Sequence, residues 1–303
     1  MSVMKRVVKS VSRKGKKVLL SREPQLVEGP KRTLFLQGRK TSDMVRDLLK
    51  DMYNIKKPDA LKLSKKNDVT VFENINPLEQ LCKKHEASLF VFGSHNKKRP
   101  DNITFGRMFD YNLLDMIELG IEHYMGLNEF PGPKITLGTK PCLIFNGEIW
   151  DKQEDLKHLK SIFVDMFRRE TTDSVRLQGL EHAISFNATN EKVFIRSYRI
   201  VLKKSGCKTP RIELDEIGPR MDFTIRRSKL PTEDLMKQAS KKPKELKEKP
   251  KKNISIDKLG TKHGRIHVGK QEIAKIQVRK MKGLKKTAAD KEMGPPAKRN
   301  RNN

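Results

Sequence analysis

Thr33-Leu34-Phe35-Leu36-Gln37-Gly38 opens a strand–turn–helix pattern that predicts the fold class. The apolar run is rich in strand formers and ends at a glycine, which is typical of a buried strand that leaves through a turn. Thr41 or Ser42 can cap the helix that we expect next. The stretch therefore predicts a strand packed on an amphipathic helix, the repeating unit of an α/β fold. The apolar stripe of that helix consists of Met44, Val45, Leu48, Leu49 and Met52.

The same pattern recurs in the second half of the chain. Cys142-Leu143-Ile144-Phe145 reads as a strand, Asn146-Gly147 as its turn, and a helix is expected over about 151–169. Since the strand and helix patterns alternate twice, the sequence indicates two α/β halves within one core.

Shorter patterns fill in the other elements. Asn76 followed by Pro77 predicts the start of a short helix. An amphipathic helix is expected over 113–121, because Leu113, Leu114, Ile117 and Ile121 lie on one helical face. The further strands are expected at 69–72, 88–92, 103–107, 183–186, 193–201 and 221–225.

Positive charge is concentrated at the two ends of the chain. Residues 236–303 carry 22 Lys and Arg against six Asp and Glu, which is 16 of the net charge of +29. Residues 1–30 carry eight basic and two acidic side chains, whereas residues 31–235 carry 36 and 29. Basic segments with few apolar residues bury too little surface to offset the entropy of ordering. We therefore expect a core over 31–235, with halves of about 31–130 and 131–235, between two basic and largely disordered arms at 1–30 and 236–303.

Charge of this density predicts a polyanionic partner, and nucleic acid is favoured. A membrane surface is the alternative, but the segment 237–252 has too few large apolar residues for a membrane-surface helix, and no run of 18 apolar residues occurs. Cys82, Cys142 and Cys207 lie sixty or more residues apart and form no CxxC pair, which favours buried or idle thiols in a reducing compartment.

Three stretches carry a more specific signal. They are residues 31–38, residues 105–120 with Phe-Gly-Arg-Met at their start and Glu-Leu-Gly at their end, and residues 213–223 with Glu-Ile-Gly-Pro-Arg. Together they resemble the Brix domain, a module of eukaryotic ribosome-assembly factors, and the resemblance spans residues 28–235. It implies an α/β fold of two similar halves, each similar to an anticodon-binding domain.

The resemblance also implies a non-enzymatic role in the nucleolus. The expected function is to help install the 5S ribonucleoprotein in the pre-60S particle, in support of pre-rRNA maturation. The expected partners are 5S rRNA, large-subunit rRNA, the ribosomal proteins that bind 5S rRNA and, as heterodimer partner, the regulator of ribosome synthesis protein.

Basic residues at turns and strand ends are the candidates for RNA contact, because such side chains can reach phosphates. Arg39 and Lys40 flank an expected helix start, where one phosphate can bind, although a solvated turn fits equally well. Arg196 beside Tyr198 can stack on bases, unless Tyr198 belongs to the core. The full set of candidates is Arg39, Lys40, Lys97, Lys98, Arg99, Arg196, Arg226, Arg227, Lys241, Lys242, Lys251 and Lys252.

Two other classes of function stay open. A protein-only scaffold would use its arms for nuclear import, and Lys285-Lys286 with residues 298–301 resembles a two-part import signal. An rRNA-processing nuclease would need a carboxylate cluster that holds a divalent metal.

Catalytic and metal-binding motifs are weak in this sequence. Arg39 follows Gly38 where a phosphate-binding loop has lysine. His263 and His267 have the spacing of two helical metal ligands, but Gly264 lies between them and no third ligand is near. We therefore expect no catalytic residue, no cofactor and no metal.

Overall fold

The structure is a computed structural model that describes residues 11–22, 26–170, 175–190, 192–207, 209–246, 251–257, 259–270, 272 and 287–292. The chain divides into two units, residues 1–246 and residues 247–303. Much of the predicted arms, including residues 1–10 and 293–303, lies outside the described residues. The expectation that the arms lack fixed structure therefore stays a prediction.

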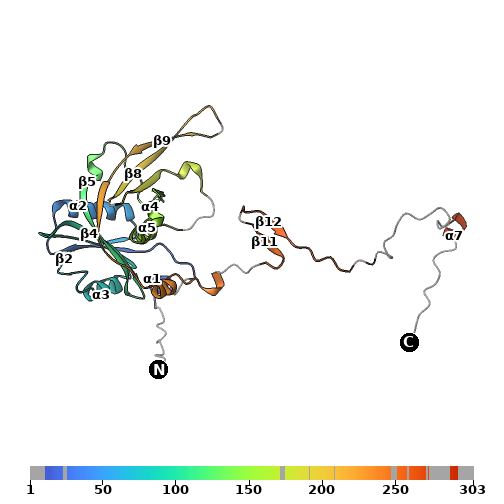
Figure 1. Ribbon diagram of the computed structural model, residues 1–303, viewed down its shortest axis with the longest axis horizontal. Helices are drawn as coiled ribbons and strands as arrows, with labels where there is room; N and C mark the ends of the chain where they lie inside the picture. Colours follow the sequence, from blue (N-terminus) through green and yellow to red (C-terminus); the bar gives the residue numbers. More distant parts are fainter. Residues whose placement is uncertain are drawn as a thin grey trace, which may run out of the picture. The chain divides into compact units, whose positions relative to one another are not determined.

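The first unit is built on one ten-stranded sheet (Figure 1). The strands follow the order β2-β1-β3-β4-β5-β10-β8-β7-β6, and β9 pairs with β8 beside this path. The bounds are β1 Thr33–Gly38, β2 Ala60–Asn67, β3 Leu89–Asn96, β4 Arg99–Phe109, β5 Asn112–Met125, β6 Cys142–Asn146, β7 His182–Ala188, β8 Lys192–Lys203, β9 Arg211–Glu216 and β10 Arg220–Lys229.

The two halves of the sheet have the same strand pattern when each is read from its outer end towards the centre. In the first half β1 and β3 are parallel, and β4 and β5 follow as antiparallel neighbours. In the second half β6 and β7 are parallel, and β8 and β10 follow in the same way. The two halves join where β5 pairs antiparallel with β10, with Gly120 opposite Thr224. The predicted fold of two α/β halves is thus confirmed, and the halves share one continuous sheet.

Six α-helices are described with the first unit, and α2 and α5 build its core. Ser42, one of the two predicted caps, is the N-cap of α2, since its hydroxyl accepts a hydrogen bond from the Val45 N–H at 3.3 Å. In the second half the expected helix over 151–169 is two helices, because Gln153 has an extended backbone that separates α4 from α5. The bounds are α1 Arg13–Arg22, α2 Asp43–Lys56, α3 Asn76–His85, α4 Ile149–Lys152, α5 Glu154–Phe167 and α6 Glu233–Ala239.

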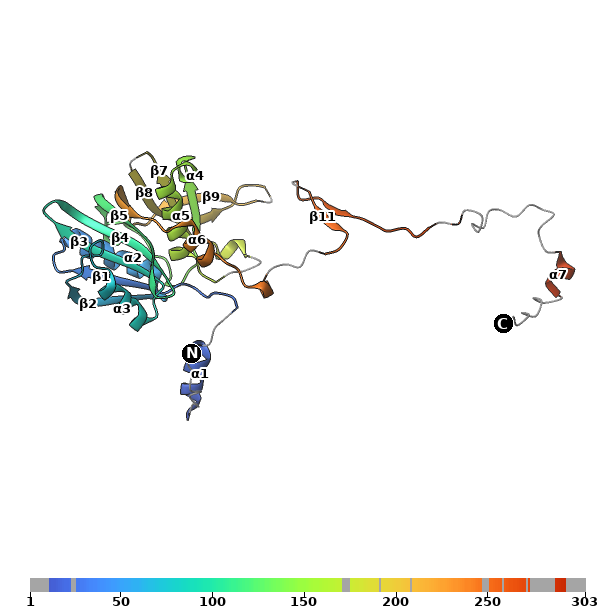
Figure 2. The ribbon, with the colours of Figure 1, turned by 60° about the horizontal axis from the view of Figure 1, so that its bottom comes forward.

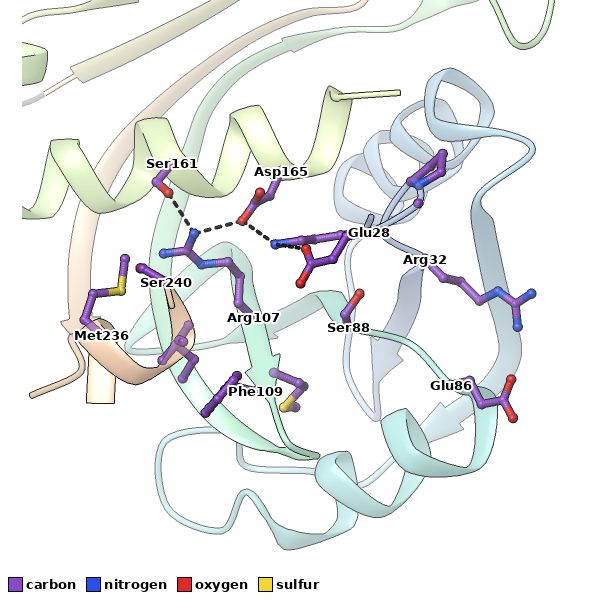
Figure 3. A pocket seen from close by; sticks show the side chains of 16 residues that line it. Glu28, Arg32, Glu86, Ser88, Arg107, Phe109, Ser161, Asp165, Met236 and Ser240 are labelled. Atoms are coloured by element: carbon purple, nitrogen blue, oxygen red, sulfur yellow. Dashed lines mark hydrogen bonds and ion pairs between the residues drawn. The ribbon is translucent and has the colours of Figure 1, made fainter. Parts of the chain in front are cut away.

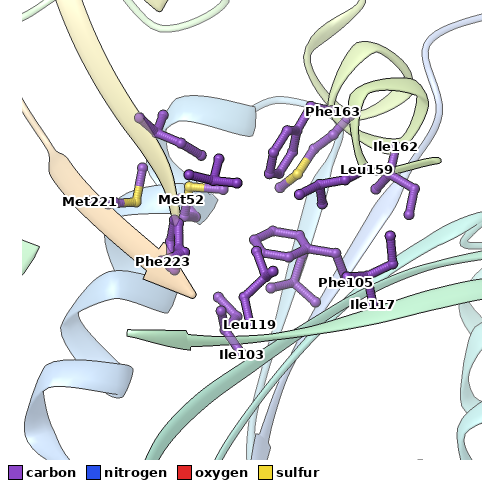
Figure 4. Close-up of a cluster of buried hydrophobic side chains, with 14 of the residues drawn as sticks. Met52, Ile103, Phe105, Ile117, Leu119, Leu159, Ile162, Phe163, Met221 and Phe223 are labelled. Carbon is purple, nitrogen blue, oxygen red and sulfur yellow. The ribbon is translucent and has the colours of Figure 1, made fainter. Parts of the chain in front are cut away.

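The main core lies between the sheet and the helices α2 and α5, so both halves contribute to it. Figure 4 shows Phe105 of β4, Phe163 of α5 and Phe223 of β10 at its centre. The Phe105 ring meets the Phe163 ring edge-on at 5.4 Å and the Phe223 ring edge-on at 6.5 Å. Such aromatic pairs bury large apolar areas and add to the stability that burial provides. The halves therefore cannot separate without exposing a shared core.

A second, smaller core covers the other face of the first half of the sheet. There α3 covers the sheet (Figure 2), and its Leu78 and Cys82 belong to one buried cluster with Leu36 and Phe92. Val71, from the turn between β2 and α3, completes this layer. Cys82 is buried as predicted, and burial, with a smaller contribution from Glu79, raises the pKa of its thiol to about 12, whereas Cys142 is half-buried and Cys207 is exposed.

Two expected elements were wrong. The predicted helix over 113–121 is part of β5. Its polar residues Asp115 and Glu118 are buried, where Asp115 pairs with Arg107 and Glu118 with Arg227. The predicted strand at 69–72 is a loop and turn, and the edge strand is β2 instead. The strand β9 was missed.

The second unit, residues 247–303, is described by itself. It contains a two-stranded hairpin of β11 Ile254–Ile256 and β12 Lys262–Gly264, and the short helix α7 Ala288–Glu292. All residues of the hairpin strands are exposed.

Candidate nucleic-acid interface

Five of the predicted RNA-binding residues lie at one end of the first half of the sheet, and two more, Arg226 and Arg227, lie beside it on β10. The parallel strands β1 and β3 end at the same edge, and the backbone N–H of His95 donates to the Lys40 carbonyl at 2.9 Å. The first residues of β4 reach the same end. Arg226 and Arg227 of β10 lie further along the sheet, beside Leu119 and Glu118 of β5, and the Arg226 side chain reaches back to Pro100 and Asn102 at the start of β4. We call this group the cationic end. It consists of Arg39, Lys40, Lys97, Lys98, Arg99, Arg226 and Arg227.

Lys97 and Lys98 form the turn between β3 and β4, and both side chains are exposed. Arg39 is also exposed, and its ion pair with Asp68, at 3.5 Å, is exposed on both sides. Exposed ion pairs of this kind contribute little, about 0–1 kcal/mol. These cations can therefore exchange their solvent or their weak partner for a phosphate.

The amino terminus of α2 faces a carboxylate of the chain itself. The Ser42 hydroxyl donates to Asp101 Oδ1 at 2.5 Å, and His95 Nδ1 lies 3.0 Å from the same oxygen. Burial raises the pKa of Asp101, but the hydrogen bonds from Ser42 and His95 outweigh it and hold the pKa below its ordinary value. A phosphate at the helix terminus would meet this negative charge, so Arg39 and Lys40 are better placed to act through their side chains alone.

Arg226 and Arg227 are held in place by the sheet. One terminal nitrogen of Arg226 donates to the Pro100 carbonyl at 2.7 Å and to Asn102. Arg227 pairs with the buried Glu118 and lies over the Phe72 ring, 3.9 Å from its centroid. Arg99 approaches the same Glu118 at 3.8 Å. Glu118 thus fixes the orientation of two cations and removes one unit of positive charge from this end.

The other predicted residues lie elsewhere. Arg196, on β8, pairs with Asp222 at 2.6 Å and donates to the carbonyls of Ile195 and Met221, with 17% of its side chain exposed. The Arg196 side chain is therefore bound by groups of β8 and β10. Lys241 and Lys242 follow α6 and are exposed, and Lys251 and Lys252 are exposed in the second unit.

A cavity of about 670 Å³ lies between the halves and is lined by charged groups that pair with one another (Figure 3). Arg107 donates to Ser161 at 2.8 Å and to Asp165 at 2.9 Å, and it also pairs with the buried Asp115. Lys31 lies 3.0 Å from Asp165. These ion pairs and hydrogen bonds link β4 and β5 to α5, and the charged groups of the cluster are paired with one another.

Two features of the described residues bear on other classes of function. No group of three or more His, Cys, Asp or Glu side chains in this part of the chain is arranged to hold a metal ion. Among the same residues, no helix is long and apolar enough to cross a membrane.

Sequence reasoning missed Glu118, Phe72 and Asp101, which orient the cations and the start of α2. Glu118 was assigned to a helix and Phe72 to a strand, and Asp101 follows a turn without any motif. Glu118 is 109 positions from Arg227 in the sequence, and Asp101 is 59 positions from Ser42. No local pattern encodes such pairs.

Comparison with known proteins gives the family. The model of the Brix domain matches residues 38–227. The ribosome production factor 2 homolog of Drosophila melanogaster is 53% identical over 94% of this chain and 90% of its own length, and the homolog of Homo sapiens is 49% identical over 87% and 86%. A solved probable ribosomal biogenesis protein from Aeropyrum pernix K1 covers 67% of this chain and 98% of its own, at 12% identity and a TM-score of 0.43. The chain belongs to the Brix domain family and, within it, to the ribosome production factor 2 proteins.

Proposed function

We propose that this chain is a non-enzymatic assembly factor of the large ribosomal subunit that binds ribosomal RNA. The names of its relatives, ribosome production factor 2 homolog, support the assembly role. The cationic end supports RNA as the ligand, because it brings together basic side chains that follow β1 and β3, the first residue of β4 and two arginines of β10. This clustering is the observation on which the proposal depends, since phosphate neutralisation supplies most of the affinity for nucleic acid.

The finer proposal concerns the step of assembly. The chain helps recruit the 5S ribonucleoprotein into the pre-60S particle and supports pre-rRNA maturation in the nucleolus. Its proposed partners are 5S rRNA, large-subunit rRNA, the ribosomal proteins that bind 5S rRNA and the regulator of ribosome synthesis protein as heterodimer partner. The Brix family membership supports this set, and the basic tail adds charge for the RNA.

The geometry suggests how the core would hold RNA. Arg226 and Arg227 are oriented before RNA arrives, through Pro100 and Glu118, so binding costs less side-chain entropy than it would for freely rotating cations. Lys97 and Lys98, at an exposed turn, can follow the path of a phosphate backbone. Such contacts read the shape of the RNA more than its sequence.

Crosslinking of the tagged protein to RNA in growing cells, followed by sequencing of the crosslinked sites, tests the proposal. Sites concentrated on 5S rRNA and adjoining large-subunit rRNA would support it. Few crosslinks, or crosslinks spread over all abundant RNA, would favour a protein-only scaffold whose arms serve nuclear import. Cleavage of precursor rRNA by the purified protein with Mg²⁺ would instead favour a nuclease.

A further inference from the structure

A small polar cavity of about 100 Å³ adjoins the cationic end. Strand residues on the face of the sheet that carries α3 line one side of it, among them Ser94 of β3, Thr104 of β4 and Glu118 of β5. The turn over residues 69–73 lines another side, and Arg99 and Arg227 also line it. The cavity therefore combines two cations with polar groups of the sheet.

Two hydroxyl groups in this cavity lack hydrogen-bond partners. Thr104 is only 3% exposed and Ser94 is half-buried. Neither side chain makes a hydrogen bond to any residue that the structure describes. Neither hydroxyl oxygen is fully enclosed, so each is open to the cavity and can form a hydrogen bond there. A polar group that enters the cavity from outside can therefore bond to both hydroxyls.

Arg227 adds a flat surface next to these hydroxyls. Its guanidinium lies on the Phe72 ring and pairs with Glu118, so its orientation is fixed from two sides. The Arg227 side chain is nevertheless 36% exposed, which leaves it accessible to a ligand. Oriented guanidinium planes stack on the bases of single-stranded RNA.

A stacking plane, paired cations and unpaired hydroxyls are together the chemistry that recognises a nucleotide. The cavity is smaller than the ~150 Å³ site that encloses benzene, so the edge of one six-membered ring fits better than the fused rings of a purine. A base within a duplex stays stacked between its neighbours and cannot enter. We infer that this cavity takes the base edge of one unpaired pyrimidine of the bound RNA, an inference that rests on the proposed RNA binding.

The test uses the full chain and three RNA stems that differ at one position: fully paired, with one bulged uridine, or with one bulged adenosine. Fluorescence anisotropy gives the affinity for each. We expect the bulged uridine to bind about fivefold more tightly than the paired stem, the equivalent of one hydrogen bond, and more tightly than the bulged adenosine. Equal affinity for all three stems would overturn the inference while leaving RNA binding intact. Loss of all binding would overturn both.

Two variants identify the groups. Thr104→Val keeps the shape of the side chain and removes the unpaired hydroxyl, so it should abolish the preference for bulged uridine without lowering the melting temperature. Lys98→Ala is the control, because Lys98 is exposed at the turn and does not line the cavity. This variant should lower the affinity for all three stems by the same factor. A preference that survives Thr104→Val, or free uridine monophosphate that binds as tightly as the bulged stem, would contradict the assignment.

Discussion

The buried charged cluster around Arg107 joins the two halves of the fold and does not face the proposed RNA. Arg107 is 5% exposed and Asp115 is fully buried, and Asp165 of α5 completes the cluster. Although burial disfavours the charged guanidinium, the hydrogen bonds and charge of Asp115 and Asp165 raise the pKa of Arg107. The guanidinium is therefore charged throughout the physiological range, and each member of the cluster depends on the others.

Replacing Arg107 with methionine should lower the free energy of unfolding by about 3–5 kcal/mol, because it leaves the carboxylate of Asp115 buried without its main partner. Urea unfolding followed by circular dichroism measures the change. Lys152→Ala is the matched control, since the Lys152–Glu148 pair is 71% and 85% exposed and should contribute less than about 1 kcal/mol. If the two variants lose the same free energy of unfolding, the cluster does not stabilise the contact between the halves.

His182 makes the stability depend on pH. Burial, with a smaller contribution from Arg169, lowers the pKa of His182 from 6.5 to about 4. The unfolded chain therefore binds this proton more readily than the folded one. The contribution of the neutral His182 to the free energy of unfolding is fully present above pH 6.5. It is lost as the pH falls towards 4, by roughly 3 kcal/mol in all.

Urea unfolding at pH 7 and pH 4.5 should therefore show a smaller loss of stability for His182→Gln than for the unchanged chain. His123→Gln is the control, because His123 is exposed on β5. If His182→Gln and His123→Gln have the same pH dependence, the buried imidazole is not the source of the effect.

At the scale of elements, the burial pattern of a helix or strand decides whether it can be predicted from the sequence. The strands β1, β6 and β8 and the helix α2 were predicted, because each has one apolar face or a short apolar run that ends at a turn. The strand β5 was not, because the core covers both of its faces from Leu114 to Ile121 and its polar residues are paired inside. The positions of exposed cations such as Lys97 could be predicted from the turn. The fixed orientation of Arg227 could not, because Phe72 and Glu118 reach it only through the tertiary fold.

Two glycines in neighbouring strands make a matched test of packing. A Cβ on Gly106 of β4 would lie 2.3 Å from the Phe90 ring and 2.9 Å from the Asp115 carbonyl, and both groups belong to the interior. A Cβ on Gly120 of β5 would meet only the end of the Arg226 side chain, at 2.3 Å. At the first site the interior would have to shift, whereas at the second the end of the Arg226 side chain can move if it gives up its hydrogen bonds to Pro100 and Asn102.

Gly106→Ala should therefore lower the free energy of unfolding by about 1–3 kcal/mol or more, as overpacking of a core does, and Gly120→Ala should cost clearly less. Thermal unfolding of the two variants gives the comparison. Gly120→Ala should still weaken RNA binding, because it moves Arg226 away from Pro100 and Asn102. A Gly120→Ala protein that is destabilised as much as Gly106→Ala would mean that Arg226 is held too firmly to move.

At the scale of the whole molecule, charge is divided between an oriented set and an exposed set. Arg99, Arg226 and Arg227 of the cationic end are oriented by Glu118 and by the Pro100 carbonyl, whereas the basic residues after α6 carry most of the net charge. Oriented cations fix the position of the RNA, and additional exposed cations mainly release counterions. The two sets should therefore respond differently to salt and to RNA shape.

Neutralising Lys241, Lys242, Lys251 and Lys252 together should flatten the dependence of log affinity on log salt by about 0.7–0.9 for each phosphate that these lysines had neutralised. The preference among RNA shapes should stay, because the cationic end is intact. Lys203→Ala with Arg211→Ala is the control: both side chains are exposed on β8 and β9, where they pair with Glu213. Titrations at several salt concentrations measure the slope. A slope that the four substitutions leave unchanged would mean that these lysines never touch RNA, and the tail would then be better explained as an import signal.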